Sequence, residues 1–128
     1  MAHARAVIGE THYRVSLKAG HHQLVADEHA EMGGQDAGPA PYELLLSALG
    51  ACTAITLKMY AERKQWPLTS VDVGLLYTRD GERGKIARIL TLEGDLDQTQ
   101  RARLAEIAER TPVTLTLKGG VDIQTELR

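Results

Sequence analysis

The longest apolar stretch of the chain lies near its middle and predicts a helix that begins at Pro41. Residues 44–57 carry no charge, and Cys52, the only cysteine, lies among them. Pro41 suits the first helical position, where its missing N–H leaves no helical hydrogen bond unmade. Glu43 falls in the first turn, where the helix dipole favours a carboxylate. Charges resume at Lys58, and Trp66-Pro67 ends the element.

Apolar residues cover every face of this predicted helix. One set recurs at helical spacing: Leu45, Leu49, Cys52, Thr56 and Met59. Leucine, isoleucine and alanine cover the remaining faces almost as well, and a helix that is apolar all round must be enclosed. The charge-free segment is shorter than the roughly 18 apolar residues that a membrane span needs. We therefore expect protein core around this helix and no membrane.

Alternating apolar positions before the helix predict strands. His3 to Ile8 and His12 to Leu17 alternate on either side of Gly9-Glu10, as two strands or one long bent strand. His21 to Asp27 can form the next strand. The polar, glycine-rich segment from Glu28 to Gly38 is expected to be a loop.

The chain after the helix predicts a hairpin and a second helix. Residues 71–77 and 86–92 alternate around a charged tip at residues 79–84. Asp97 is the expected N-cap of an amphipathic helix whose apolar stripe includes Leu104 and Ile107. These elements, with the strands before the central helix, predict an α+β fold.

Two segments near the C-terminus differ in how clearly they can be interpreted. Residues 111–117 alternate polar and apolar, which by periodicity is a strand, but Thr111 as N-cap and Pro112 as first residue would equally suit a short helix. Val121, Ile123, Thr125 and Leu127 alternate with polar residues and predict a last strand.

Composition narrows the possible partners and the compartment. The 128 residues show no break in composition, which predicts one domain over residues 1–128. A formal net charge of -2 without a Lys/Arg cluster argues against nucleic acid and favours small molecules or a second copy of the chain. The start Met1 to Arg5 has no apolar region typical of a secretory signal, and one cysteine cannot form an internal disulfide. We expect a cytoplasmic protein.

The candidate chemistry centres on Cys52, for which a purely structural role is the simplest alternative. A free cysteine on a core helix commonly acts as a small buried hydrophobe. Glu43 could likewise be only a helix-start carboxylate. His21-His22, with His12 and His29, has no recognised metal-ligand spacing, so we expect neither a metal nor a cofactor.

A carboxylate nine residues before the only cysteine belongs to a longer motif, Pro39-x-Pro41-x-Glu43-Leu-Leu-Leu-x-Ala-Leu-x-Ala-Cys52, followed later by Thr111-Pro112-Val113 and Gly119-Gly-Val-Asp-Ile123. In these segments the chain resembles the OsmC/Ohr family, the osmotically inducible and organic hydroperoxide resistance proteins. The resemblance implies an intertwined α+β homodimer in which sheets wrap long central helices. Against the alternation of residues 111–117, it also implies a short helix that begins near Pro112 and is capped by Thr111. It also implies thiol-dependent reduction of organic hydroperoxides, an antioxidant activity in the response to oxidative stress.

The resemblance assigns roles to single residues. Cys52 matches the peroxidatic cysteine, whose thiolate attacks the peroxide and becomes a sulfenic acid, and Glu43 matches the carboxylate that holds the site's arginine. Thr111 occupies the position of the resolving cysteine, so no internal disulfide can form. The usual arginine is absent before the second strand, which leaves Arg14, or less favourably Arg5, as its substitute.

Two functions follow from these matches and departures. One is a single-cysteine peroxidase with catalytic Cys52, Glu43 and Arg14, reduced by an external thiol. The other is a noncatalytic module that binds an apolar ligand or partner in the dimer cleft.

Nine helical residues give about 900° of rotation and a rise of roughly 13 Å, so Glu43 and Cys52 of one straight helix face opposite ways. A shared site would therefore combine Glu43 of one subunit with Cys52 of the other.

Overall fold

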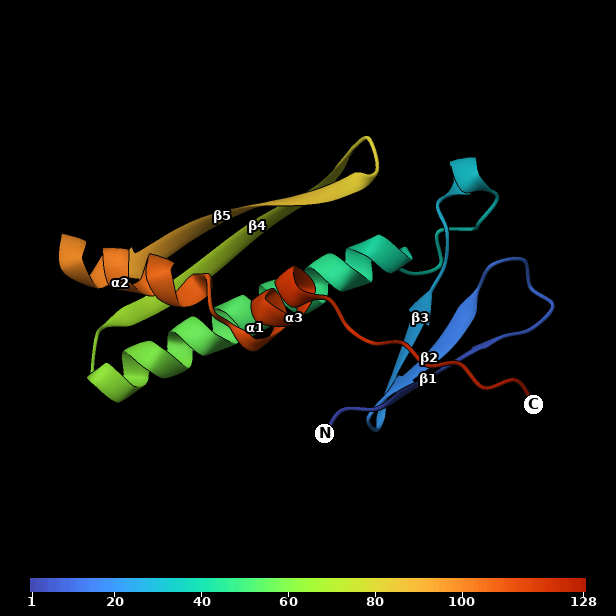
Figure 1. Cartoon of the computed structure of the whole chain (residues 1–128), viewed down its shortest axis with the longest axis horizontal. Helices are drawn as coiled ribbons and strands as arrows, with labels where there is room; N and C mark the ends of the chain where they lie inside the picture. The colour runs from blue at the N-terminus through green and yellow to red at the C-terminus, as the bar shows by residue number, and fades with distance from the viewer. The chain divides into compact units, whose positions relative to one another are not determined.

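The computed structural model describes residues 1–128 and comprises two compact units, Met1–Leu45 and Leu46–Arg128, with one helix running across their boundary. The elements in chain order are β1 (Ala4–Ile8), β2 (Val15–Ala19), β3 (His22–Ala26), the short 3-10 helix η1 (Ala30–Met32), α1 (Pro41–Lys64), β4 (Leu68–Asp80), β5 (Arg83–Gly94), α2 (Gln98–Ala108) and α3 (Pro112–Gly119) (Figure 1). Both sheets are antiparallel, so the α+β class is as predicted. The single domain expected from composition stays a prediction.

The first unit is built on a three-stranded meander in the order β1-β2-β3. The two alternating runs are separate strands, and β2 begins only at Val15. Residues 9–14 are taken up by a turn in which the Arg14 N–H donates to the Thr11 carbonyl at 3.0 Å and His12 has a φ of 37°. The turn places Arg14 directly before β2.

Asp27 organises the loop that follows the meander. Its buried carboxylate accepts backbone N–H groups of Glu28, Gln35 and Ala37 at 2.7, 3.3 and 3.1 Å. The bond from Ala37, with those from the other two donors, holds the pKa of Asp27 below its ordinary value. A Cβ at Gly34 would lie 2.1 Å from the Glu28 carbonyl oxygen, so this position requires glycine. The predicted loop is confirmed, with η1 inside it.

The second unit packs α1 and α2 against the β4–β5 hairpin (Figure 1). Its core consists of Leu57, Ala61, Leu68, Leu96, Leu104 and Ala108. The hairpin is confirmed, but its ladder extends to the pair Asp80 and Arg83, so only residues 81–82 of the predicted tip form the turn. Asp97 caps α2 as predicted, in a reciprocal capping box with Gln100.

The central helix is as long as predicted, but this chain covers only one of its faces. The buried positions are Leu49, Thr53, Leu57 and Ala61, four residues apart. Ile55 and Met59 are each 54% exposed. The expectation of a helix enclosed all round is therefore not met within one chain, because one hairpin and two short helices reach only one face.

The set noted at helical spacing on α1 is not its buried face, since Leu45 and Met59 are exposed. By length and composition alone α1 could cross a membrane, with a mean hydropathy of 1.5 over its most apolar window. A core helix of a soluble protein meets the same criterion, so this is weak evidence for a membrane.

The C-terminal predictions divide between one correct and one wrong. Residues 112–119 form α3, with Thr111 as N-cap and Pro112 in the first position, so the helix alternative holds and the strand read from alternation does not. The last predicted strand is absent: residues 120–128 pair with no strand of this chain. Ile123 and Leu127 are 86% and 95% exposed. Alternation alone therefore did not produce a strand, because a strand also requires pairing with a neighbour.

Candidate functional site

The sulfur of Cys52 lies against the beginning of α3. Cys52 is half-buried on α1, and its Sγ accepts the backbone N–H of Val113 with 3.5 Å between nitrogen and sulfur. The hydroxyl of Thr56, one turn later on α1, is 3.9 Å from the same sulfur. The thiol therefore lies between polar groups of two helices, the Thr56 hydroxyl of α1 and the Val113 N–H of α3.

Thr111 and Pro112 fix this end of α3. The buried Thr111 hydroxyl oxygen accepts the Thr114 N–H at 3.4 Å, and Pro112 has no N–H that needs a partner. The Val113 N–H belongs to the first turn, where no carbonyl within the helix can accept it, so it is free for the sulfur. An N–H at a helix N-terminus stabilises negative charge in front of it.

The helix that carries Cys52 is not the one that supplies a donor to its sulfur. Cys52 lies in the middle of α1, and the dipole of a helix acts mainly at its ends. The N-terminus of a different helix, α3, supplies the donor instead. Thr111 at the resolving-cysteine position thus has a structural role as the cap of that helix.

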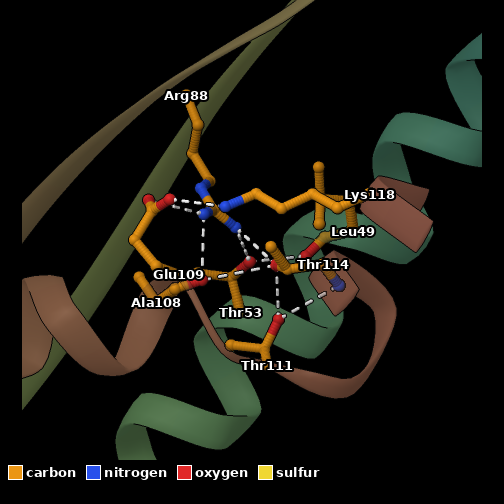
Figure 2. A network of polar contacts seen from close by, with 8 residues as sticks. All are labelled: Leu49, Thr53, Arg88, Ala108, Glu109, Thr111, Thr114 and Lys118. Carbon is orange, nitrogen blue, oxygen red and sulfur yellow. Dashed lines mark hydrogen bonds and ion pairs between the residues drawn. The ribbon is translucent and has the colours of Figure 1, made fainter. Parts of the chain in front are cut away.

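Arg88 joins the elements around Cys52 into one network, shown in Figure 2. Its side chain is 12% exposed and extends from β5. Nη1 donates to the hydroxyls of Thr53 and Thr114, each at 3.0 Å, while Nη2 donates to the Ala108 carbonyl at 2.9 Å and to Glu109 at 3.3 Å. One guanidinium therefore connects α1, the end of α2 and α3.

The hydroxyls in the network satisfy one another without conflict (Figure 2). The Thr114 hydroxyl can donate to the Ala108 carbonyl at 3.3 Å, while the Thr111 hydroxyl lies 2.6 Å from that of Thr114. Thr53 donates to the Leu49 carbonyl at 2.7 Å. No buried side-chain polar atom lacks a partner, so the network is complete.

Glu109 closes the network toward solvent. Its carboxylate accepts a bond from Lys118 at 2.8 Å and one from Arg88 at 3.3 Å. The bond from Lys118, assisted by the charge of Arg88, lowers the pKa of Glu109. The carboxylate is therefore an anion at neutral pH, paired with two cations, and its single negative charge balances one of their two positive charges.

A cavity of about 580 Å³ lies beside this network. Its lining mixes charged with apolar side chains: Arg83, Arg88, Glu109, Lys118, Leu49, Ile86 and Leu117. Thr114 also lines it, whereas Cys52 does not. The cavity could hold an amphipathic small molecule close to the beginning of α3.

Glu43 has a local structural role in the first unit. Its carboxylate accepts the Ala40 N–H at 2.9 Å and so caps the beginning of α1. His29 Nε2 lies 3.7 Å from the same oxygen. This contact set agrees with the helix-start interpretation, and the catalytic role that the resemblance implies stays a prediction.

Arg14 and Arg5 lie in one hollow on the meander. The hollow measures about 670 Å³ and is also lined by Lys18. Lys18 on β2 lies opposite Arg5 on β1 in the strand register. Arg14 forms no ion pair with Glu43, the carboxylate it was predicted to contact. The role of Arg14 beside Cys52 is untested and stays a prediction.

Sequence reasoning missed Arg88. The signal was present, since Ile86, Leu90 and Leu92 occupy alternate, half-buried positions of β5, and Arg88 completes that row. An arginine at an inward position must find several acceptors or a ligand. No group of three or more His, Cys, Asp or Glu side chains could hold a metal ion.

Comparison with known proteins agrees with this architecture. The family described as OsmC-like protein matches residues 33–126. No curated protein sequence is significantly similar to the chain. Among solved structures, an OsmC-like protein from Mycoplasma pneumoniae superposes with a TM-score of 0.80 at 19% identity, covering 93% of this chain and 88% of that one.

Two further structures carry names that refer to hydroperoxides. The organic hydroperoxide resistance protein OhrB of Bacillus subtilis has a TM-score of 0.65 at 21% identity, with 100% of this chain and 98% of that one covered. An organic hydroperoxide resistance protein OsmC from Legionella pneumophila has a TM-score of 0.64 at 23% identity, with coverages of 95% and 92%. At these identities the likeness establishes a shared fold.

Proposed function

The chain belongs to the OsmC-like protein family, and from this premise we propose that it reduces organic hydroperoxides through Cys52 with an external thiol as reductant. The single observation that carries the proposal is the Val113 N–H that donates to the Cys52 sulfur at the beginning of α3. A sulfur that acts only as a small hydrophobe needs no such donor. A thiolate nucleophile benefits from one.

The reaction proceeds in two stages. The Cys52 thiolate attacks the terminal oxygen of the hydroperoxide, an S–O bond forms as the O–O bond breaks, and the alkoxide leaves as alcohol after taking a proton. The sulfur is oxidised to a sulfenic acid. A thiol of an external dithiol then attacks that sulfur, releases water and forms a mixed disulfide. The second thiol of the dithiol attacks the mixed disulfide, which releases the Cys52 thiol and leaves the reductant as a disulfide.

An external reductant is required because this chain has one cysteine. Thr111 cannot form a disulfide with Cys52. A compartment that keeps small thiols reduced would supply the second stage, so we place the protein in the cytoplasm.

We further propose that the working unit is a homodimer with Glu43 and Arg14 contributing to its sites. The exposed face of α1, which includes Ile55 and Met59, and the exposed segment with Ile123 and Leu127 support a second copy as the missing cover. Glu43 of one subunit would then act on Cys52 of the other. Arg14 would provide the cation that the family's arginine provides.

A noncatalytic binding module is the second candidate function. The cavity beside Arg88 supports it, because an amphipathic lining of Leu49, Ile86 and Leu117 with cationic side chains suits a ligand whether or not a reaction follows. In this case Cys52 would be a structural residue of a helix in the dimer cleft.

The decisive experiment mixes the reduced protein with an alkyl hydroperoxide and measures its mass. We expect one added oxygen on Cys52 and slow turnover when a small dithiol is present. Cys52→Ser is the matched control and should neither gain oxygen nor consume peroxide. A thiol that stays unmodified after prolonged exposure, or equal turnover by Cys52→Ser, would favour the binding module.

A further inference from the structure

The sulfur contact joins Cys52 and Val113, and Arg88 bonds to the residue that follows each of them in the sequence. Thr53 follows Cys52 on α1, and Thr114 follows Val113 on α3; both hydroxyls accept from the same Nη1 at 3.0 Å (Figure 2). One nitrogen atom of Arg88 therefore bonds to both helices and fixes how far the beginning of α3 lies from α1. The sulfur contact, at 3.5 Å, lies directly beside this connection.

We propose that Arg88 is a positioning residue that holds the N-terminus of α3 against the Cys52 sulfur and so maintains the thiol's reactivity. The proposal rests on the proposed function for its biological meaning. Arg88 itself does not need to contact the peroxide. It acts through Thr53 and Thr114.

The chemistry of the side chain suits this role. A guanidinium presents five donors in a rigid plane, so it can bond to several acceptors at fixed angles, whereas a lysine ammonium cannot reproduce that geometry. Arg88 also bonds to the Ala108 carbonyl at 2.9 Å, one of the last carbonyls of α2, which have no partner within the helix. The end of α2 and the beginning of α3 are thus fixed by one group.

Arg101 offers a matched control because it makes a similar number of bonds elsewhere. Its guanidinium donates to the carbonyls of Leu92, Gly94 and Leu96 at 3.0, 3.2 and 3.4 Å. It joins α2 to the end of β5 and has no bond to α1 or α3. Replacing it should affect folding stability without affecting the sulfur contact.

The test measures the alkylation rate of Cys52 by iodoacetamide, which requires no peroxide. Arg88→Met should slow alkylation at neutral pH by about tenfold, because the helix donor is no longer held at the sulfur. In strong alkali, where thiols are ionised regardless, the rate should approach that of the wild type. Arg101→Met should retain the wild-type ratio of the two rates. Thr114→Val removes the α3 acceptor of Arg88 together with the contacts of that hydroxyl to Thr111 and the Ala108 carbonyl. It should resemble Arg88→Met and replaces it if that variant fails to fold.

Two outcomes would overturn the positioning role. One is a wild-type ratio of neutral to alkaline rates in both Arg88→Met and Thr114→Val. The other is the same change of ratio in Arg101→Met, which would mean that general loosening is the cause. Failure of the wild-type protein to form a sulfenic acid would refute the proposed function instead, and the alkylation result would remain distinguishable from it.

Discussion

The backbone N–H of Val113 donates to the sulfur of Cys52, across 61 positions of sequence and 3.5 Å of space. No pattern in the sequence predicts that these two residues are in contact. The contact exists because Thr111 and Pro112 begin a helix where α3 meets α1. It gives the only cysteine a donor without a histidine or arginine at bonding distance.

Thr111→Val should destabilise the protein while leaving its shape intact. Loss of an N-cap hydroxyl that also bonds to the Thr114 side chain should lower the free energy of unfolding by about 1–2 kcal/mol. Urea unfolding followed by circular dichroism measures the difference. Thr116→Val, at an exposed position of the same helix, is the control and should change stability by less than about 0.5 kcal/mol. Equal stability of wild type and Thr111→Val would contradict the capping role.

Thr111→Cys should restore the disulfide that the resemblance implies for related peroxidases. After reaction with one equivalent of alkyl hydroperoxide, the sulfenic acid at Cys52 should be attacked by the new thiol, and mass spectrometry should find an internal disulfide instead of an added oxygen. Thr116→Cys on the same helix is the control and should retain the oxygen. A stable sulfenic acid in Thr111→Cys would mean that the position cannot resolve Cys52.

Much of the fold could be predicted from the sequence because it depends on local signals. Pro41 and Asp97 mark helix starts through chemistry confined to one turn. The hairpin follows from alternation around a charged tip. For residues 111–117 two local signals disagreed, and the cap at Thr111 prevailed over the alternation because it satisfies the exposed N–H groups of a helix end.

The errors concern what lies beyond one chain or between distant segments. Alternation from Val121 to Leu127 predicted a strand, but the segment joins neither sheet, because pairing depends on a neighbour and not on alternation alone. Burial all around α1 was inferred from its own residues, although only surrounding elements can supply it. The candidate site was found through Cys52, whereas Arg88 was missed because its acceptors come from three separate elements.

Acid should destabilise the protein in part through Asp27. Its pKa is lowered in the folded state by backbone N–H donors, so its stabilising contribution is complete above the ordinary value of about 3.9 and is lost as the pH falls through the lower folded value. Asp27→Asn should therefore be less stable than wild type at neutral pH, with a difference that shrinks in acid. Urea unfolding over a pH series measures this. Exposed Glu31→Gln is the control, and a gap for Asp27→Asn that stays constant with pH would contradict the assignment.

Dimer formation should depend on the exposed C-terminal segment. Ile123, at 86% exposure in one chain, should be buried by a second copy, so Ile123→Asp should shift light scattering at micromolar concentration from dimer toward monomer. If the second copy pairs this segment as a strand, adjacent side chains face opposite ways, so Gln124→Asp adds the same charge at the next position and should leave the dimer intact. Wild-type monomers with native circular dichroism would refute the dimer itself.

Glu43 should act on Cys52 of the other subunit if it acts in catalysis at all. The structure confirms one continuous helix from Pro41 to Lys64, which was the assumption behind a half turn between the two residues. Glu43 also caps α1 through the Ala40 N–H, so a test must spare that bond. Glu43→Gln does so, because glutamine serves in the same capping position while the charge is removed.

Mixed dimers of Cys52→Ser and Glu43→Gln chains provide the decisive measurement. If each site combines the two subunits, a mixed dimer contains one complete site, with Glu43 from the Cys52→Ser chain and Cys52 from the Glu43→Gln chain. Its other site lacks both groups. The mixed dimer should then have about half the peroxidase activity of the wild-type dimer, although each parent alone is weak. An equal mixture after random exchange, of which about half is mixed dimer, should reach about a quarter of the wild-type activity. If the site lies within one subunit, mixing restores nothing, since every Cys52 remains beside a glutamine. Unchanged activity on mixing, with dimer exchange verified by mass, would refute the composite site.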